Sequence, residues 1–120
     1  MDCNLLYMQQ LLGKKWSVFI LEGLSNKRAL SFNQLRKRLG KVTNRILSAR
    51  LKALEKNFLV QRKIIQEKPL LVSYSLTKKG DDFVKVIHTI KRWGVEYRLV
   101  PQYCTSTDCN TCIKNKPDLR

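Results

Sequence analysis

Apolar residues recur every three or four positions along the first half of the chain, a spacing that predicts amphipathic helices. A short first helix has Leu5, Met8 and Leu12 on one face and ends at Gly13, a residue type that commonly terminates helices. A second helix is expected over residues 15–24, where the apolar spacing is again helical. The N-terminal part of the chain is therefore predicted to be helical.

A third and a fourth helix follow, joined by a short turn. Residues 31–34 read Ser-Phe-Asn-Gln, a pattern in which side chain and backbone cap each other, so the third helix is predicted over residues 32–39. Gly40 and Lys41 form the turn. The fourth helix is predicted over residues 42–58, with an apolar stripe made of Leu47, Leu51, Leu54 and Phe58. Two helices joined by such a brief Gly-containing turn form a helix-turn-helix.

The remaining faces of the helix at residues 42–58 carry cationic and hydrogen-bonding side chains suited to phosphates and base edges. We predict that this helix lies in a DNA major groove. The candidates for base edges, near its N-terminal end, are Asn44, Arg45 and Ser48. The set of DNA-binding candidates on this helix is completed by Thr43, Arg50 and Lys52, of which Arg50 and Lys52 are expected on phosphates. The alternative is a solvated helix with an ordinary charged face.

Beyond residue 58 the pattern changes to alternation, which predicts strands. Val60–Ile64 and Val72–Leu76 alternate, and the polar stretch Gln66–Pro69 between them makes the pair a hairpin. A helix-turn-helix followed at once by a basic hairpin is a winged helix, whose wing typically contacts phosphates or the minor groove. The expected contacts are Arg62, Lys63 and Lys68. The alternative is a hairpin with a solvated basic tip.

A long last helix is predicted over residues 78–99, because Thr77 can cap its start and Asp81 and Asp82 favour the positive end of the helix dipole. Its apolar face is broader than the core of a small domain needs. We therefore predict a two-fold homodimer, formed with the first helix, that places two recognition helices roughly 34 Å apart. The predicted dimer interface consists of Leu5, Met8, Phe83, Ile87, Ile90, Trp93 and Tyr97. The alternative is burial of this face in the chain's own core.

The predicted elements give an α+β fold that is mainly α, and the composition is that of one small globular domain. The chain has 120 residues, of which 43% are hydrophobic and 28% charged, as in globular proteins. A winged helix-turn-helix domain with N- and C-terminal dimerisation helices is expected over residues 1–100, and a cysteine-containing tail over residues 101–120. No apolar run reaches the roughly 18 residues of a membrane span, and Gln9 and Gln10 interrupt the first apolar segment. Neither a membrane segment nor a signal peptide is expected, which predicts a cytoplasmic protein.

The positive charge is concentrated in the middle of the chain. The net charge is +15, and residues 27–68 hold 13 bases and 2 acids. Such a field favours double-stranded nucleic acid as the partner, because binding releases condensed counterions. An alternative that the charge supports equally well is a sequence-tolerant, chromatin-like protein that coats DNA. A regulator would bind its site at least about a thousandfold more tightly than random DNA, whereas a coating protein would not.

These motifs also carry a family resemblance. The matching segments are Gly13-Lys14-Lys15-Trp16, Phe32-Asn33-Gln34-Leu35, Leu47-Ser48-Ala49-Arg50-Leu51, and Tyr74-Ser75-Leu76-Thr77 with Gly80. From about residue 3 to residue 93 the chain resembles the HxlR-type regulators, winged-helix relatives of the MarR transcription factors. The resemblance implies a dimeric, DNA-binding transcription factor, most members being repressors.

The resemblance also draws attention to Cys3. Many members have a cysteine close ahead of the glycine-lysine-tryptophan motif that senses oxidants or electrophiles, and Cys3 lies at about that place. The proline that usually follows this cysteine is replaced by Asn4. Thiolate reactivity requires a lowered pKa, for which Lys14 and Lys15 are the nearby cations in the sequence.

The end of the chain contains a C-x4-C-x2-C pattern made of Cys104, Cys109 and Cys112. Together with Cys3 these residues would supply four thiolates, the set that binds zinc or, ranked below it, an iron-sulfur cluster. Cysteines of a cytosolic protein more often indicate metal or redox chemistry than structural disulfides. Three alternatives stay open: a metal site, a redox-active or structural disulfide, and free thiols.

No residue pattern indicates an enzyme. Cys109-x-x-Cys112 follows a helix in a polar tail, whereas a dithiol oxidoreductase places this motif at a helix start after a strand. His88 is the only histidine and falls within an amphipathic helix. A remaining non-enzymatic alternative is a metal- or redox-dependent interaction module that does not bind DNA.

Overall fold

The structure, a computed structural model, describes residues 4–99. The four cysteines, at positions 3, 104, 109 and 112, lie outside this range, and so does the predicted tail at residues 101–120. The side chain of Leu5 also lies outside the described part. Within residues 4–99, no helix has the length and apolar character needed to cross a membrane.

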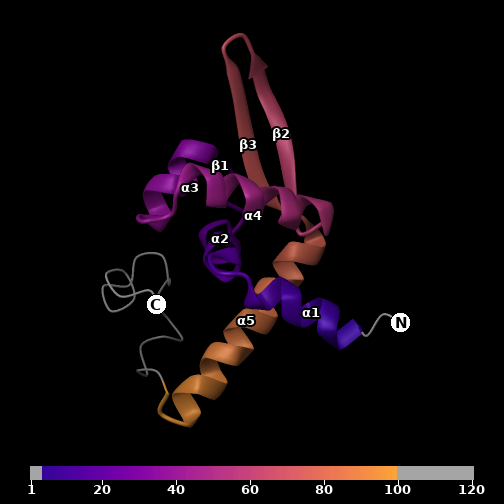
Figure 1. Cartoon of the computed structure of the whole chain (residues 1–120), viewed down its shortest axis with the longest axis vertical. Coiled ribbons are helices and arrows are strands. Elements are labelled where there is room, and N and C mark those ends of the chain that lie inside the picture. Colours follow the sequence, from indigo (N-terminus) through magenta and orange to yellow (C-terminus); the bar gives the residue numbers. More distant parts are fainter. Residues whose placement is uncertain (1–3, 100–120) are drawn as a thin grey trace.

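The architecture is mainly helical with a small antiparallel sheet, as the sequence predicted (Figure 1). In chain order the elements are α1 (Asn4–Gly13), α2 (Ser17–Gly23), β1 (Leu30–Ser31), α3 (Phe32–Leu39), α4 (Asn44–Lys56), β2 (Val60–Glu67), β3 (Leu70–Leu76) and α5 (Lys78–Glu96). The strand order in the sheet is β1-β3-β2. The β2-β3 hairpin projects from one end of the molecule, and the C-terminal half of α5 extends from the opposite end (Figure 1). The fold is a winged helix-turn-helix.

Helix starts are set by local capping. Oγ of Ser31 accepts a hydrogen bond from the amide of Gln34 at 3.2 Å, and Oε1 of Gln34 accepts one from the amide of Ser31 at 2.8 Å. This is the predicted capping box. Thr77 caps α5, as predicted, by accepting from the amide of Gly80 at 3.0 Å. Thr43 caps α4 in the same way, so this helix begins at Asn44, two residues later than the sequence predicted.

The end of α4 corrects one prediction. Phe58 was placed on the apolar stripe, but its side chain is 72% exposed and its φ is 61°. The amide of Phe58 donates to the carbonyl of Glu55, and the amide of Leu59 donates to that of Leu54, both at 3.0 Å. These bonds form a Schellman motif, in which a left-handed residue ends the helix. Leu59, only 2% exposed, takes the core position instead of Phe58.

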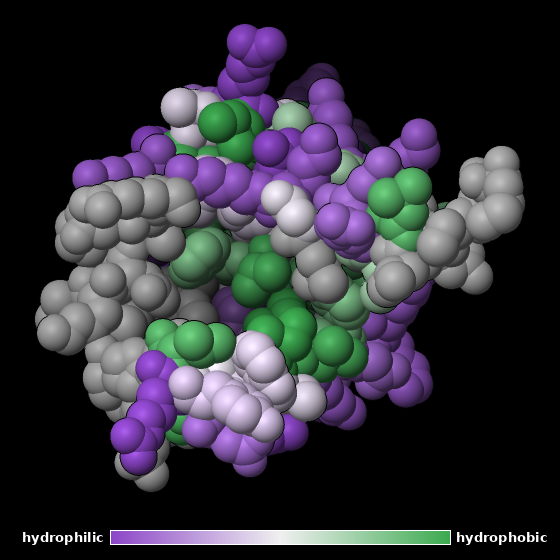
Figure 2. All heavy atoms as spheres, turned by 60° about the horizontal axis from the view of Figure 1, so that its bottom comes forward, coloured by the Kyte–Doolittle hydropathy of each residue, from purple (hydrophilic) through white to green (hydrophobic). Residues whose placement is uncertain are grey.

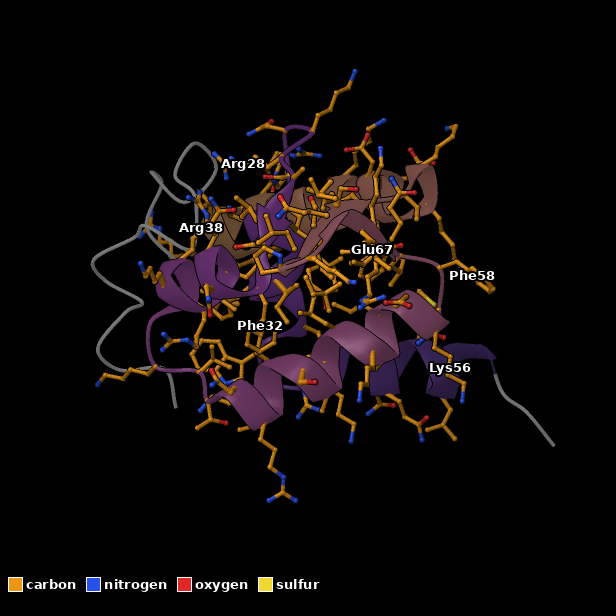
Figure 3. All side chains as sticks on the ribbon, turned by 90° about the horizontal axis from the view of Figure 1, so that it is seen from above. Arg28, Phe32, Arg38, Lys56, Phe58 and Glu67 are labelled. Atoms are coloured by element: carbon orange, nitrogen blue, oxygen red, sulfur yellow. The ribbon has the colours of Figure 1, made fainter. Side chains whose placement is uncertain are left out.

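The core lies where α2, α3, α4 and α5 meet the base of the hairpin. Its fully buried side chains include Ile20, Leu24, Leu35, Leu47, Leu51, Leu54 and Val60. Phe32 is partly buried and packs against this core from the first turn of α3 (Figure 3). Phe83 and Ile87 of α5 belong to the same core, with 9% and 3% of their surface exposed. This corrects the prediction that they lie at a dimer interface, because the chain itself covers both side chains.

Gly80 allows α5 to approach the start of β2 closely. A Cβ atom at this position would lie 2.0 Å from the carbonyl oxygen of Leu59, a distance no real Cβ contact shows. The same junction is held by the amide of Thr77, which donates to Leu59 O at 3.1 Å. The absence of a side chain at Gly80 therefore allows the start of α5 to pack directly against the main chain at Leu59.

The sheet is larger than predicted. Strands β2 and β3 run further toward the turn than residues 64 and 72, and their register skips Ile65, the extra residue of a β-bulge. β1, which pairs Leu30 with Tyr74 and Ser31 with Ser73, was not predicted. A strand of this length carries no alternation that could reveal it.

Candidate nucleic-acid interface

The exposed face of α4 is basic and lies opposite the core. Arg45 and Lys52 are exposed, seven residues apart, on the side of the helix away from the buried leucines. Lys56 is exposed on the same face, at the C-terminal end of α4 (Figure 3). Sequence reasoning did not include Lys56, although its spacing of four residues from Lys52 was the available signal. This face presents three cations in a row along one helix.

The first turn of α4 places the other base-contact candidates. Asn44 is exposed, and Ser48 is half-buried at the edge of the same face. The Oγ1 atom of Thr43 accepts the amide hydrogen of Ile46 at 3.2 Å, so its lone pair serves the helix while its hydroxyl hydrogen can still be donated. The structure therefore gathers Thr43, Asn44, Arg45 and Ser48 around the N-terminal end of α4.

Arg50 lies elsewhere. It is half-buried on the side of α4 that faces the junction of α1 and α2, and its Nε donates to the carbonyl of Lys15 at 2.9 Å. This junction also contains Trp16, which is buried, has a φ of 81° and packs against Phe19. Arg50 can therefore make the predicted phosphate contact only with the guanidinium nitrogens that are not bonded to Lys15.

The basic wing residues are exposed but do not share one face. Arg62 and Lys63 are consecutive residues of β2, so their side chains leave opposite faces of the hairpin. Arg62 pairs with Tyr74, and Lys63 pairs with Ser73. Lys68 is exposed in the turn, where its carbonyl accepts a hydrogen bond from Nε2 of Gln66 at 2.9 Å. β2 packs against α4 at its base, so the wing leaves the body of the protein beside this helix (Figure 1).

A buried acid that the sequence analysis missed connects α2 to α5. Glu22 is 3% exposed; its Oε1 lies 3.0 Å from Nε2 of His88, and its Oε2 lies 3.7 Å from Nζ of Lys91. The contact with His88 lacks good hydrogen-bond geometry. The only sign of this contact in the sequence was that Glu22 is a single acid within an apolar stretch. His88 thus contacts a carboxylate that links the two helices.

Apolar side chains are exposed on α5 and α1. On α5 and just beyond its end they are Val86, Ile90, Trp93, Tyr97 and Leu99. On α1 they are Leu6 and Met8, which leave opposite sides of the helix because they are two residues apart. The rings of Trp93 and Tyr97 lie 5.2 Å apart. Figure 2, in which the lower end of Figure 1 comes forward, shows apolar side chains gathered on this end of the molecule. Exposed apolar side chains gathered in this way are typical of an interaction surface.

Metal binding by residues 4–99 finds no support in their arrangement. Within this range, no group of three or more histidine, cysteine, aspartate or glutamate side chains is placed to hold a metal ion. The predicted zinc or iron-sulfur ligands are the cysteines outside the described residues.

Comparison with known proteins agrees with this geometry. The family model described as HxlR-like helix-turn-helix matches residues 11–101. An uncharacterised HTH-type transcriptional regulator of Halalkalibacterium halodurans is 34% identical over 90 residues, which cover 75% of this chain and 80% of the relative. The reduced form of the transcriptional regulator YodB from B. subtilis has a TM-score of 0.71 at 30% identity, covering 81% of this chain and 95% of YodB.

The redox regulator HypR in its oxidised form has a TM-score of 0.68 at 26% identity, with 78% of this chain and 96% of HypR covered. The relatives are DNA-binding regulators and not enzymes, in agreement with the sequence prediction, and they do not favour a DNA-coating protein. The chain belongs to the HxlR-like helix-turn-helix family of transcriptional regulators.

Proposed function

We propose that the protein is a cytoplasmic, homodimeric repressor that binds a pseudo-palindromic operator, with α4 of each protomer in a major groove. The observation that carries this proposal is the row of Arg45, Lys52 and Lys56 on the exposed face of α4, directly opposite the buried leucines. A helix held by its apolar side and cationic on the other can approach DNA without disturbing the core.

Within this proposal the residues have different roles. Arg45, Asn44 and Ser48, at the N-terminal end of α4, contact base edges, because that end of a recognition helix enters the groove. Lys52 and Lys56 contact phosphates along the same face. The wing cations Arg62, Lys63 and Lys68 contact phosphates or the minor groove beside it. Thr43 orients the helix start, and Arg50 positions α4 against the α1-α2 junction.

The dimer is proposed to form through the apolar surface of α1 and α5. The predicted interface residues that are exposed in the single chain are Met8, Ile90, Trp93 and Tyr97. Val86 and Leu99 extend the same surface and replace Phe83 and Ile87 among the candidates. An apolar surface on the two terminal helices supports a two-fold arrangement, in which the same patch is used by both protomers.

Thiol chemistry is proposed as the regulatory input. YodB has been solved in reduced and diamide-treated forms, and HypR is described as a redox regulator. By analogy, oxidation of Cys3 or of Cys104, Cys109 and Cys112 would change DNA affinity. The competing proposal is a structural zinc ion bound by the same thiolates, in which case removal of zinc by a chelator would change affinity and mild oxidant would first release the metal.

Binding-site selection from a random duplex library tests the proposal. We expect the purified protein to enrich a two-fold motif and to bind it at least about a thousandfold more tightly than a scrambled duplex at the same salt concentration. Equal affinity for both duplexes would indicate a DNA-coating protein and would refute the proposed function. Repeating the titration with diamide-treated protein tests the thiol input separately.

A further inference from the structure

The outer half of the wing exposes apolar side chains. Leu70 and Ile65 are each 59% exposed, and Ile64 and Leu71 are each 48% exposed. We call these four residues the wing tip. Solvent-facing ends of hairpins are usually polar or charged, because an exposed apolar strand invites non-specific pairing. Exposure of this kind favours a binding partner for the wing tip.

The strand register shows how this apolar surface arises. Val60 pairs with Leu76 and Ile64 pairs with Val72, so these residues share one face of the hairpin. Alternation along β3 puts Leu70 on that face too. The face starts in the core, where Val60 is 1% exposed, and continues beyond the body of the protein. The helices cover only its base (Figure 1).

The charges around the wing tip favour DNA as the partner. The hairpin carries Arg62, Lys63 and Lys68, and its only acid is Glu67, next to the turn. The wing also packs at its base against α4, the helix of the DNA-binding surface. The apolar surface of α5 lies toward the opposite end of the molecule, which argues against the same second copy covering both (Figure 1).

We infer that the wing tip acts as an apolar wedge in the DNA minor groove, with Leu70 inserted at a base step beside the half-site that α4 contacts. This inference rests on the proposed function. Leucine and isoleucine side chains are among those that unstack base pairs from the minor groove and bend the duplex. Leu70 is the leading side chain, because it directly follows the turn at Lys68 and Pro69 and is as exposed as any residue of the wing tip.

The wedge adds specificity at a position where no base-edge hydrogen bond is made. Pyrimidine-purine steps such as TA and CA/TG unstack most easily, so they become favoured at a fixed distance from the α4 contacts. The flanking lysines hold the phosphates on each side of the widened groove. Glu67 opposes this attraction, so Glu67→Gln should strengthen binding to all duplexes alike.

The test is a binding-site selection with the full-length wild-type protein and three variants. Leu70→Ser removes the leading side chain, and Leu70→Ser with Ile64→Ser also removes the exposed apolar side chain that shares its face. Phe58→Asn is the matched control, because Phe58 is an exposed apolar residue at the base of the hairpin (Figure 3). We expect the wild type and the control to enrich a flexible step beside the half-site. The Leu70 variants should keep the half-site motif, lose the step preference, and bind the selected duplex roughly tenfold more weakly.

A 2-aminopurine probe at the selected step provides the second measurement. Its fluorescence should rise when the wild-type protein binds, since unstacking relieves quenching, and should not rise with the double variant. A selected half-site with no flanking step preference and no fluorescence change would overturn the wedge while leaving the proposed function intact. Failure to select any half-site would overturn both. A smaller assembly in sedimentation of the DNA-free double variant would identify the wing tip as a protein contact instead.

Discussion

Nε of Arg50 donates a 2.9 Å hydrogen bond to the main-chain carbonyl of Lys15, 35 residues earlier in the chain. The bond joins the middle of α4 to the junction between α1 and α2. In the proposed function, α1 carries part of the dimer surface and α4 the DNA-binding surface, so this bond joins the two proposed surfaces.

The Arg50 bond predicts a loss of stability that an ordinary DNA-contact residue would not cause. Arg50→Ala should lower the free energy of unfolding by about 1 kcal/mol, the typical net contribution of one hydrogen bond. Lys52→Ala, on the exposed face of the same helix, should change it by less than about 0.5 kcal/mol. Urea denaturation of both variants measures the difference, and equal stability of the two would show that the Arg50 bond contributes nothing.

Substitution of Gly80 is predicted to lower the stability of the protein more than substitution of Arg50. Gly80→Ala should reduce the free energy of unfolding by about 3 kcal/mol, because the added methyl group would overlap the carbonyl of Leu59 and force α5 away from β2. Gly13→Ala is the control, since no atom lies within 4 Å of a Cβ built there. Thermal unfolding of the two variants in parallel distinguishes them. If Gly80→Ala were as stable as the control, α5 would be able to move away from the carbonyl of Leu59 without loss of stability.

Phe58 predicts a gain in stability. A non-glycine residue pays about 1 kcal/mol for left-handed backbone, and asparagine tolerates this conformation better than phenylalanine. Phe58→Asn should therefore raise the free energy of unfolding by about 0.5 kcal/mol, because the exposed ring contributes little burial. Phe58→Ala keeps the strained conformation and should give no such gain. If alanine stabilised as much as asparagine, exposure of the ring and not the backbone would be the cause.

Glu22 predicts coupling between α2 and α5. Glu22→Gln should cost about 2 kcal/mol of stability, because it removes the buried charge that faces His88 and Lys91. A double-mutant cycle with Lys91→Met measures the coupling. The double variant should lose less stability than the two single variants added together. Strict additivity would show that the 3.7 Å contact between Glu22 and Lys91 is not energetically significant.

Sequence reasoning succeeded where the determinants are local. The capping residues Ser31, Gln34 and Thr77 act within one helical turn, so the starts of α3 and α5 could be predicted from a few neighbouring residues. Burial of Leu47, Leu51 and Leu54 followed from their spacing. The same spacing failed at the next position, where the left-handed turn at Phe58 directs the chain into β2.

Contacts between distant segments could not be predicted in this way. The Arg50 bond to Lys15 and the Glu22 cluster depend on how helices pack, which periodicity does not report. β1 is too short to show a pattern, and it exists because β3 offers an edge to pair with. For α5, spacing identified the apolar residues but could not divide the core members Phe83 and Ile87 from the exposed Ile90 and Trp93.

The most direct test of the central claim, that the exposed face of α4 reads DNA sequence, is the affinity of Arg45→Ala for the selected duplex and for a scrambled one. We predict a loss of about 1–3 kcal/mol per half-site on the selected duplex and almost no loss on the scrambled one. Lys52→Ala should instead weaken both equally and reduce the salt slope by about one unit per protomer. Equal losses on both duplexes for Arg45→Ala, or no loss on either, would contradict the account.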